Sequence, residues 1–264
     1  MLKKIAIIIV ILIAVIFAVF VFLKNEAVAP APEANITVSS PGLNDKVSNP
    51  IIVKGQARVF ENTFAYALKD KAGNKLYENY AMTDSPDMGL FGNYTVKIPV
   101  PVLAPKDLVV EVFEYSAKDG SVTNLVRVPV ELASQEKSIV KIHFSNSKLD
   151  PEITCVKTFP VERQIYKTQE VAFIALSELL SGPTRQETDA GYITSINEGV
   201  RINSIKIENE TAHVDFNETL EASVGGSCRV SAIRWQIVNT LKEFPTVKNV
   251  IISINGRTED ILQP

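Results

Sequence analysis

The sequence predicts three parts: an N-terminal transmembrane helix, an all-β sandwich and an α+β domain. An unbroken apolar run predicts the first part, and about 100 residues of alternating apolar positions predict the second. In the remainder, similar strands are interleaved with two helical patterns, which is typical of an α+β domain. The chain has 264 residues, of which 46% are hydrophobic and 22% charged, and its net charge is −3. This composition excludes a wholly disordered chain, and the mild acidity disfavours nucleic-acid binding.

The apolar run extends from Ile5 to Leu23 and contains 19 residues. A helix of that length spans about 28 Å, close to the roughly 30 Å of a bilayer core. Lys3 and Lys4 precede the run, so the positive-inside rule puts the N-terminus in the cytoplasm. We therefore expect residues 1–24 to form a cytoplasmic stub and signal anchor of a single-pass protein of the cell membrane, with the remaining domains extracytoplasmic.

A cleaved signal peptide is the alternative, because Ala27-Val28-Ala29 resembles a cleavage site. The apolar run is longer than a typical signal-peptide core of about 7–15 residues, and Pro30 would directly follow the cut. These two facts favour an uncleaved anchor. Residues 25–34, which are rich in proline and alanine, then form an extended linker.

Residues 35–132 are predicted to form short strands separated by turns. Apolar side chains recur at every second position, as half-buried strands require. Turn residues follow two of these segments, at Asp70–Asn74 and Lys118–Ser121. The length and about seven such strands predict an immunoglobulin-like sandwich. The clearest alternating segments are Phe64–Leu68, Tyr94–Val100, Val109–Tyr115 and Val126–Leu132.

Residues 138–264 show a different pattern, after a linker at about 133–137. Thr168 is the expected N-cap of a first helix over residues 171–180, and Gly182-Pro183 should end it. A second helix carries apolar residues from Ile233 to Phe244 and should stop at Pro245. The expected strands are Val140–Phe144, Ile205–Ile207, Ala212–Phe216 and Val250–Ile254.

The sequence offers few residues for catalysis. His213 and Asp215 share one strand face, and such a pair could orient an imidazole, but no nucleophile motif accompanies them. A solvated strand face is therefore the better interpretation of the pair. His143 lies on the face opposite the apolar residues of its own strand. Glu111 and Glu114 fall on opposite strand faces and cannot act as a pair. No metal-binding motif is present, so we expect no catalytic, cofactor-binding or metal-binding residue.

Cys155 and Cys228 are the only two cysteines, and both belong to the predicted extracytoplasmic part. A disulfide is favoured in such a compartment. Two free buried thiols are the alternative. A catalytic thiol is less favoured, because it would need a nearby base and an electropositive setting.

Two stretches of the chain resemble known domain families. The second domain resembles the GerMN family, the bacterial sporulation and spore germination domain. The first is similar to the immunoglobulin-like domain of bacterial spore germination that often precedes GerMN. The residues that carry the GerMN resemblance are Pro160-Val161-Glu162-Arg163, Leu179–Thr184, Val214-Asp215-Phe216, Thr240-Leu241 with Phe244, and Val250, Ile252, Ile254 and Gly256. The residues that carry the resemblance of the first domain to the immunoglobulin-like family are Ser40-Pro41, Val47–Pro50, Gly55, Ala57–Glu61 and Ser116–Ser121.

The resemblance implies non-catalytic, extracytoplasmic modules of the bacterial cell envelope without a cofactor. Together with the predicted anchor, it favours a membrane-anchored binding or scaffold protein. Its implied partners are envelope proteins or peptidoglycan. An envelope-polymer hydrolase is the rival hypothesis, and it would need two carboxylates about 5–9.5 Å apart across a cleft. A sensing role is a third possibility, although only Met1–Lys4 would lie in the cytoplasm.

Overall fold

The computed structural model describes residues 34–263. The predicted anchor, Ile5–Leu23, lies outside the described residues. Among the helices within them, none combines the length and the apolar character needed to cross a membrane. By their contacts, the residues from Asn35 onward form one compact unit.

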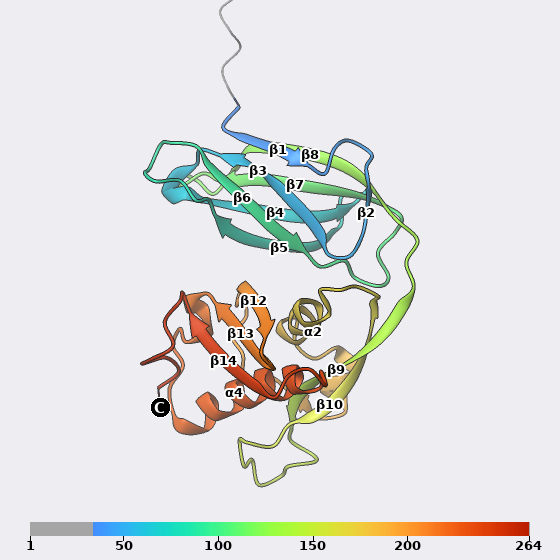
Figure 1. The fold of residues 1–264 in the computed structure, drawn as a ribbon, viewed down its shortest axis with the longest axis vertical. Helices are drawn as coiled ribbons and strands as arrows, with labels where there is room; N and C mark the ends of the chain where they lie inside the picture. The colour runs from blue at the N-terminus through green and yellow to red at the C-terminus, as the bar shows by residue number, and fades with distance from the viewer. Residues whose placement is uncertain (1–33, 264) are drawn as a thin grey trace, which may run out of the picture. The chain divides into compact units, whose positions relative to one another are not determined.

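The first part of this unit is a sandwich of two sheets (Figure 1). Three strands form one sheet in the order β1-β3-β6, and five form the other in the order β2-β8-β7-β4-β5. The expected all-β architecture is therefore confirmed. There is one strand more than expected, because β2 has only two residues and is too short to leave an alternating pattern in the sequence. The elements are β1 (Ile36–Ser40), β2 (Lys46–Val47), β3 (Ile51–Ala57), the 3₁₀ turn η1 (Phe60–Asn62), β4 (Thr63–Asp70), β5 (Lys75–Met82), β6 (Gly92–Ile98), β7 (Asp107–Tyr115) and β8 (Val122–Leu132).

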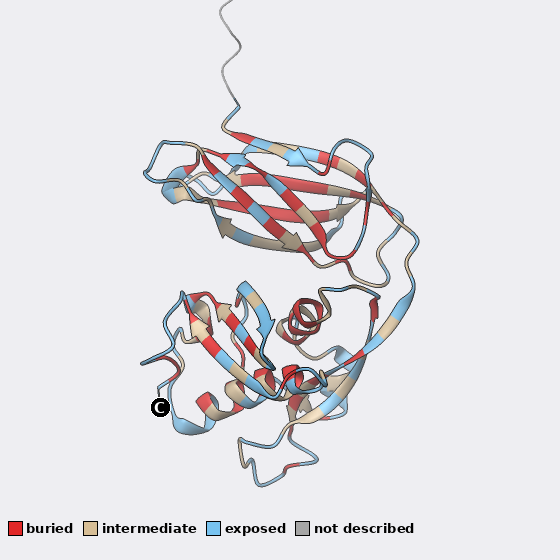
Figure 2. Ribbon diagram, viewed as in Figure 1, coloured by how far each residue is buried: buried red, intermediate tan, exposed pale blue. Residues whose placement is uncertain are grey.

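The core of the sandwich lies between its sheets, and buried residues alternate with more exposed ones along β3 and β6 (Figure 2). Phe64, Leu68 and Ile98 are among its fully buried side chains. Gly55 is required in β3 because a Cβ there would lie 1.9 Å from the carbonyl oxygen of Thr37. The missing side chain lets Tyr94 cross β3 and donate a hydrogen bond of 2.9 Å to that same oxygen.

The second part is an α+β domain whose first sheet has the order β10-β9-β11 and whose second has the order β12-β13-β14. The chain passes from β13 to β14 through a helix, and these two strands pair in parallel, as a crossover connection requires. The elements are β9 (Lys137–Asn146), β10 (Phe159–Tyr166), α2 (Val171–Leu180), α3 (Arg185–Asp189), β11 (Tyr192–Ile193), β12 (Ile202–Glu208), β13 (Thr211–Phe216), the 3₁₀ turn η2 (Glu218–Leu220), α4 (Ser227–Lys242) and β14 (Asn249–Ile254).

Helices α2 and α4 pack against each other and against β9. The buried stripe of α4 includes Ile233, Ile237 and Leu241, at the spacing of one helix face. It also includes Gln236, which accepts a hydrogen bond from Thr194 Oγ1 at 2.9 Å. The sheets and helices of this domain therefore share one apolar core.

The last described residues belong to that core. Ile261 and Leu262 are almost fully buried. Arg234 donates a hydrogen bond of 2.9 Å from Nη2 to the carbonyl oxygen of Ile261, and Glu221 accepts one from the backbone N–H of Leu262 at 3.3 Å. The chain thus folds back over the domain after β14.

Three expectations for the second domain need correction. The N-cap of α2 is Glu170 rather than Thr168, whose hydroxyl instead accepts a hydrogen bond from the backbone N–H of Glu170 at 3.1 Å.

Strand β10 was not expected, because Pro160 and the charged Glu162 and Arg163 interrupt its apolar pattern. Helix α4 ends at Lys242, three residues before Pro245. The end of α2 at Leu180, before Gly182-Pro183, is as expected.

Candidate functional site

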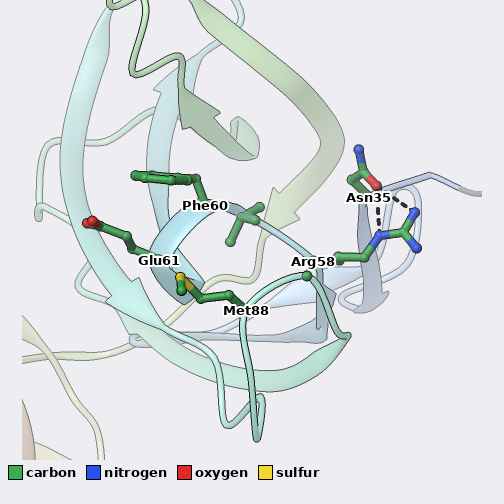
Figure 3. Close-up of a pocket in the computed structure, with 7 residues that line it drawn as sticks. Asn35, Arg58, Phe60, Glu61 and Met88 are labelled. Carbon is green, nitrogen blue, oxygen red and sulfur yellow. Dashed lines mark hydrogen bonds between the residues drawn. The ribbon is translucent and has the colours of Figure 1, made fainter.

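A cavity of about 480 Å³ opens at one end of the sandwich (Figure 3). Three separate segments of the chain line it: the residue before β1, the segment that runs from the end of β3 into η1, and the connection from β5 to β6. Phe60 of η1 and Met88 of the connection are 64% and 68% exposed. Because single exposed apolar residues are common, the informative feature is that these two line one cavity. The remaining lining residues are Asn35, Arg58, Val59, Glu61 and Gly89.

The η1 turn holds its residues in an unusual backbone conformation. Glu61 and Asn62 have φ angles of +52° and +56°, in the left-handed region. For a non-glycine residue this region costs about 1–2 kcal/mol. Hydrogen bonds at both flanks hold the turn, from the backbone N–H of Phe60 to Glu114 and from the backbone N–H of Thr83 to the carbonyl oxygen of Asn62. Strain that the surroundings maintain is typical of functional turns.

Arg58 is fixed on one side of the cavity. The Cζ atom of its guanidinium lies over the ring of Phe91, 4.7 Å from the ring centroid. Its Nε and Nη2 atoms donate hydrogen bonds of 3.2 and 2.9 Å to Asn35 Oδ1. Figure 3 shows Arg58 and Asn35 on one side of Phe60 and Met88, and Glu61 on the other. The cavity therefore presents a cation and an anion at opposite ends of an apolar surface.

A second cavity, of about 510 Å³, contains two carboxylates. Glu136 is paired with Lys167 at 2.8 Å, and Glu170 with Lys97, also at 2.8 Å. Each carboxylate is therefore engaged by an ammonium group, which is not the arrangement of an acid and a nucleophile facing a glycosidic bond. This geometry gives no support to the hydrolase hypothesis. That the chain is not an enzyme stays a prediction.

Cys155 and Cys228 form a disulfide with their Cα atoms 5.1 Å apart. The bond joins the loop between β9 and β10 to the first turn of α4. In the same loop, Asp150 accepts hydrogen bonds from the backbone N–H and the hydroxyl of Thr154, at 2.8 and 2.7 Å. Of the three hypotheses for the cysteines, the structure contains the disulfide.

The two histidines have different surroundings. His213 is exposed, as expected. The side chain of His143, by contrast, is only 12% exposed. Its ring nitrogens lie 3.0 Å from Thr158 Oγ1 and 2.9 Å from Glu243 Oε1. Neither partner could be identified from the sequence, since they are 15 and 100 residues away.

Asp215 does not orient His213. Its carboxylate accepts hydrogen bonds from Ser253 Oγ at 2.6 Å and from the backbone N–H of Gly256 at 2.8 Å. It therefore ties β13 to the end of β14. Across residues 34–263, no three His, Cys, Asp or Glu side chains gather as a metal would require.

Arg163, part of the motif before α2, lies at the centre of an ion-pair cluster. It is 13% exposed and donates to Glu178 at 3.0 Å, to Glu187 Oε1 at 2.9 Å and to the carbonyl oxygen of Gly182 at 3.1 Å. Glu187 also forms a capping box with Thr184 at the start of α3. This motif therefore holds the turn after α2 in place, which is a structural role.

Comparison with known proteins gives two family matches. Residues 35–121 match the family described as the immunoglobulin-like domain of bacterial spore germination. Residues 141–260 match the family described as sporulation and spore germination. Both families were expected from the sequence, and both are confirmed.

The chain is also similar to individual proteins. Over 104 residues it is 30% identical to the spore germination protein GerM of Bacillus subtilis (strain 168), a match that spans 38% of this chain and 28% of that protein. The tandem GerMN domains of the sporulation protein GerM from Bacillus subtilis are 25% identical, with a TM-score of 0.36, over 48% of this chain and 41% of that one. The first GerMN domain of the same protein is 19% identical, with a TM-score of 0.35, over 46% and 85% of the two chains.

Proposed function

We propose that the chain is a non-catalytic binding protein of the cell envelope that acts in sporulation or in spore germination. The two family matches support this, because an immunoglobulin-like domain of bacterial spore germination is followed by a sporulation and spore germination domain. The cavity with Phe60 and Met88 supports the binding role, because two exposed apolar side chains line one opening between a fixed cation and an anion. The partners proposed for it are envelope proteins or peptidoglycan.

Photo-crosslinking in intact cells tests the binding role. A photoreactive amino acid in place of Met88 is expected to capture an envelope component. The same amino acid in place of Lys71 should not, because Lys71 is exposed in the turn after β4, at the other end of that strand from η1. In a chain that also carries Phe60→Ser, capture from position 88 should fall several-fold without loss of folding. Equal capture from positions 88 and 71, or none from either, would contradict the proposed role.

We also propose that residues 5–23 anchor the chain in the membrane with the N-terminus in the cytoplasm. Lys3 and Lys4 support this orientation. An alkaline phosphatase reporter fused after Pro264 is expected to be active, because this enzyme requires an oxidising compartment. A cytoplasmic reporter at the same position should be inactive. A mature N-terminus at Pro30 or Ala31 would show that the segment is cleaved as a signal peptide.

A further inference from the structure

We infer that the cavity at the end of the sandwich binds a short peptide segment that carries a carboxylate and an ammonium group on either side of an apolar side chain. This inference rests on the proposed binding function and names the chemistry of the partner. Three features of the cavity carry it: the orientation of Arg58, the free carboxylate of Glu61 and the apolar surface between them.

The surroundings of Arg58 favour the binding of a carboxylate. The contact with the Phe91 ring and the two hydrogen bonds to Asn35 Oδ1 together restrict the orientation of its guanidinium. The hydrogen bonds engage Nε and Nη2, whereas Nη1 has no hydrogen-bond partner within residues 34–263, and no acidic side chain there forms an ion pair with Arg58. A guanidinium held in one plane loses little entropy when it binds a planar anion, so its remaining N–H groups favour a carboxylate.

Glu61 provides the opposite charge. Its carboxylate accepts no hydrogen bond and forms no ion pair in the described part of the chain. The left-handed backbone of this residue positions the side chain beside Phe60, on the side of the cavity away from Arg58 (Figure 3). A flexible ammonium group, which can donate three hydrogen bonds, is the complementary ligand.

The surface between the two charges is apolar and adaptable. Phe60 contributes a ring and Met88 a flexible thioether, and the buried Val59 is a further apolar residue of the lining. Methionine adjusts to ligands of different shape, which suits a site for an aliphatic side chain. In an extended peptide every second side chain points to the same face, so charged residues two positions before and two after an apolar residue can flank it on one surface.

The paired charges distinguish this ligand from others. A neutral ligand, such as an uncharged sugar, would cover both ionic groups without compensating either, which is unfavourable. An anionic ligand would satisfy Arg58 but would meet Glu61 with the same sign of charge, and a cationic one would have the converse problem. A segment with one charge of each sign satisfies both ends.

The test uses blocked peptides, acetylated and amidated, so that only side chains are charged. The probes are Glu-Leu-Lys and the same peptide with two or three leucines, titrated calorimetrically into the full-length chain. Each probe is compared with two analogues: in one, glutamine replaces the glutamate, and in the other, glutamine replaces the lysine. We expect at least one probe length to bind about tenfold more tightly than both of its analogues, which corresponds to about 1.4 kcal/mol per charge.

Variants of the chain assign each charge to its residue. Arg58→Gln should abolish the preference for glutamate over glutamine and keep the preference for lysine. Glu61→Gln should do the reverse. Lys54→Gln, an exposed change on β3, should leave both preferences intact.

Two results would overturn the inference: no difference between probe and analogues at concentrations up to about 10 mM, or a preference that neither variant changes. If Met88 crosslinks an envelope component while the peptides fail, only this inference is wrong. If crosslinking from position 88 fails as well, the proposed binding function is wrong too.

Discussion

Reduction of the disulfide between Cys155 and Cys228 is expected to lower the free energy of unfolding of the α+β domain by about 4 kcal/mol. The two cysteines are 73 residues apart in sequence, so the bond removes much of the conformational freedom of the unfolded chain. A typical domain is stable by only about 5–15 kcal/mol, so the loss is large. The measurement is thermal unfolding with and without dithiothreitol.

The Cys228→Ser variant provides the control. It should unfold at the lower temperature of the reduced protein, and dithiothreitol should have no further effect on it. The double variant with Cys155→Ser should match the single one. If the reductant destabilises Cys228→Ser as much as it destabilises the native chain, the bond does not stabilise the domain.

Replacement of Arg163 by methionine is expected to destabilise the same domain by about 3–5 kcal/mol, the usual result of removing one partner from a buried ionic group. The variant leaves Glu178 and Glu187 mostly buried, close together and without their guanidinium. The matched control is Lys206→Met, which breaks the exposed pair with Glu208 and should cost at most about 1 kcal/mol. Chemical denaturation of both variants measures the difference.

The destabilisation by Arg163→Met should depend on pH. Burial raises the pKa of Glu178 even in the native protein. Burial acts in the same direction on Glu187, but hydrogen bonds from Arg163 and Thr184 outweigh it and hold the pKa of that carboxyl below its usual value. Without Arg163 the pKa values of both carboxyls should be higher than in the native protein, so the cost is present at pH 7 and shrinks as the pH falls and the carboxyls of the variant become protonated. A cost that is equal at pH 7 and at about pH 4.5 would contradict this explanation.

Most strands could be predicted because burial leaves a period of two in the sequence. Strand β13 illustrates this, since Ala212, Val214 and Phe216 all face the core. Strand β10 was missed because one of its inward positions is Arg163, which is buried through ion pairs. A charged residue can occupy a core-facing position when its partners come from elsewhere, and sequence periodicity does not reveal those partners.

The candidate site could not be predicted as a site. Arg58, Phe60 and Glu61 were recognised only as part of a family motif, and Met88 not at all. The cavity depends on two left-handed residues that are not glycines, Glu61 and Asn62, so the glycine that most often marks such a turn is missing. It also depends on bringing Met88 beside residues about 30 positions earlier, which only the sheet pairing of β3, β4, β5 and β6 achieves.

The burial of Ile261 and Leu262 has a consequence for the order in which the protein is made. Apart from Tyr166, the sandwich has every member of its core once the ribosome has passed Leu132, whereas the core of the second domain is complete only at Leu262. At about 5–20 residues per second, these 130 residues take on the order of ten seconds to synthesise. Once its last strand has left the ribosome, the sandwich can fold, while β9 and α2 still lack the later members of their shared core in α4, β14 and the final residues.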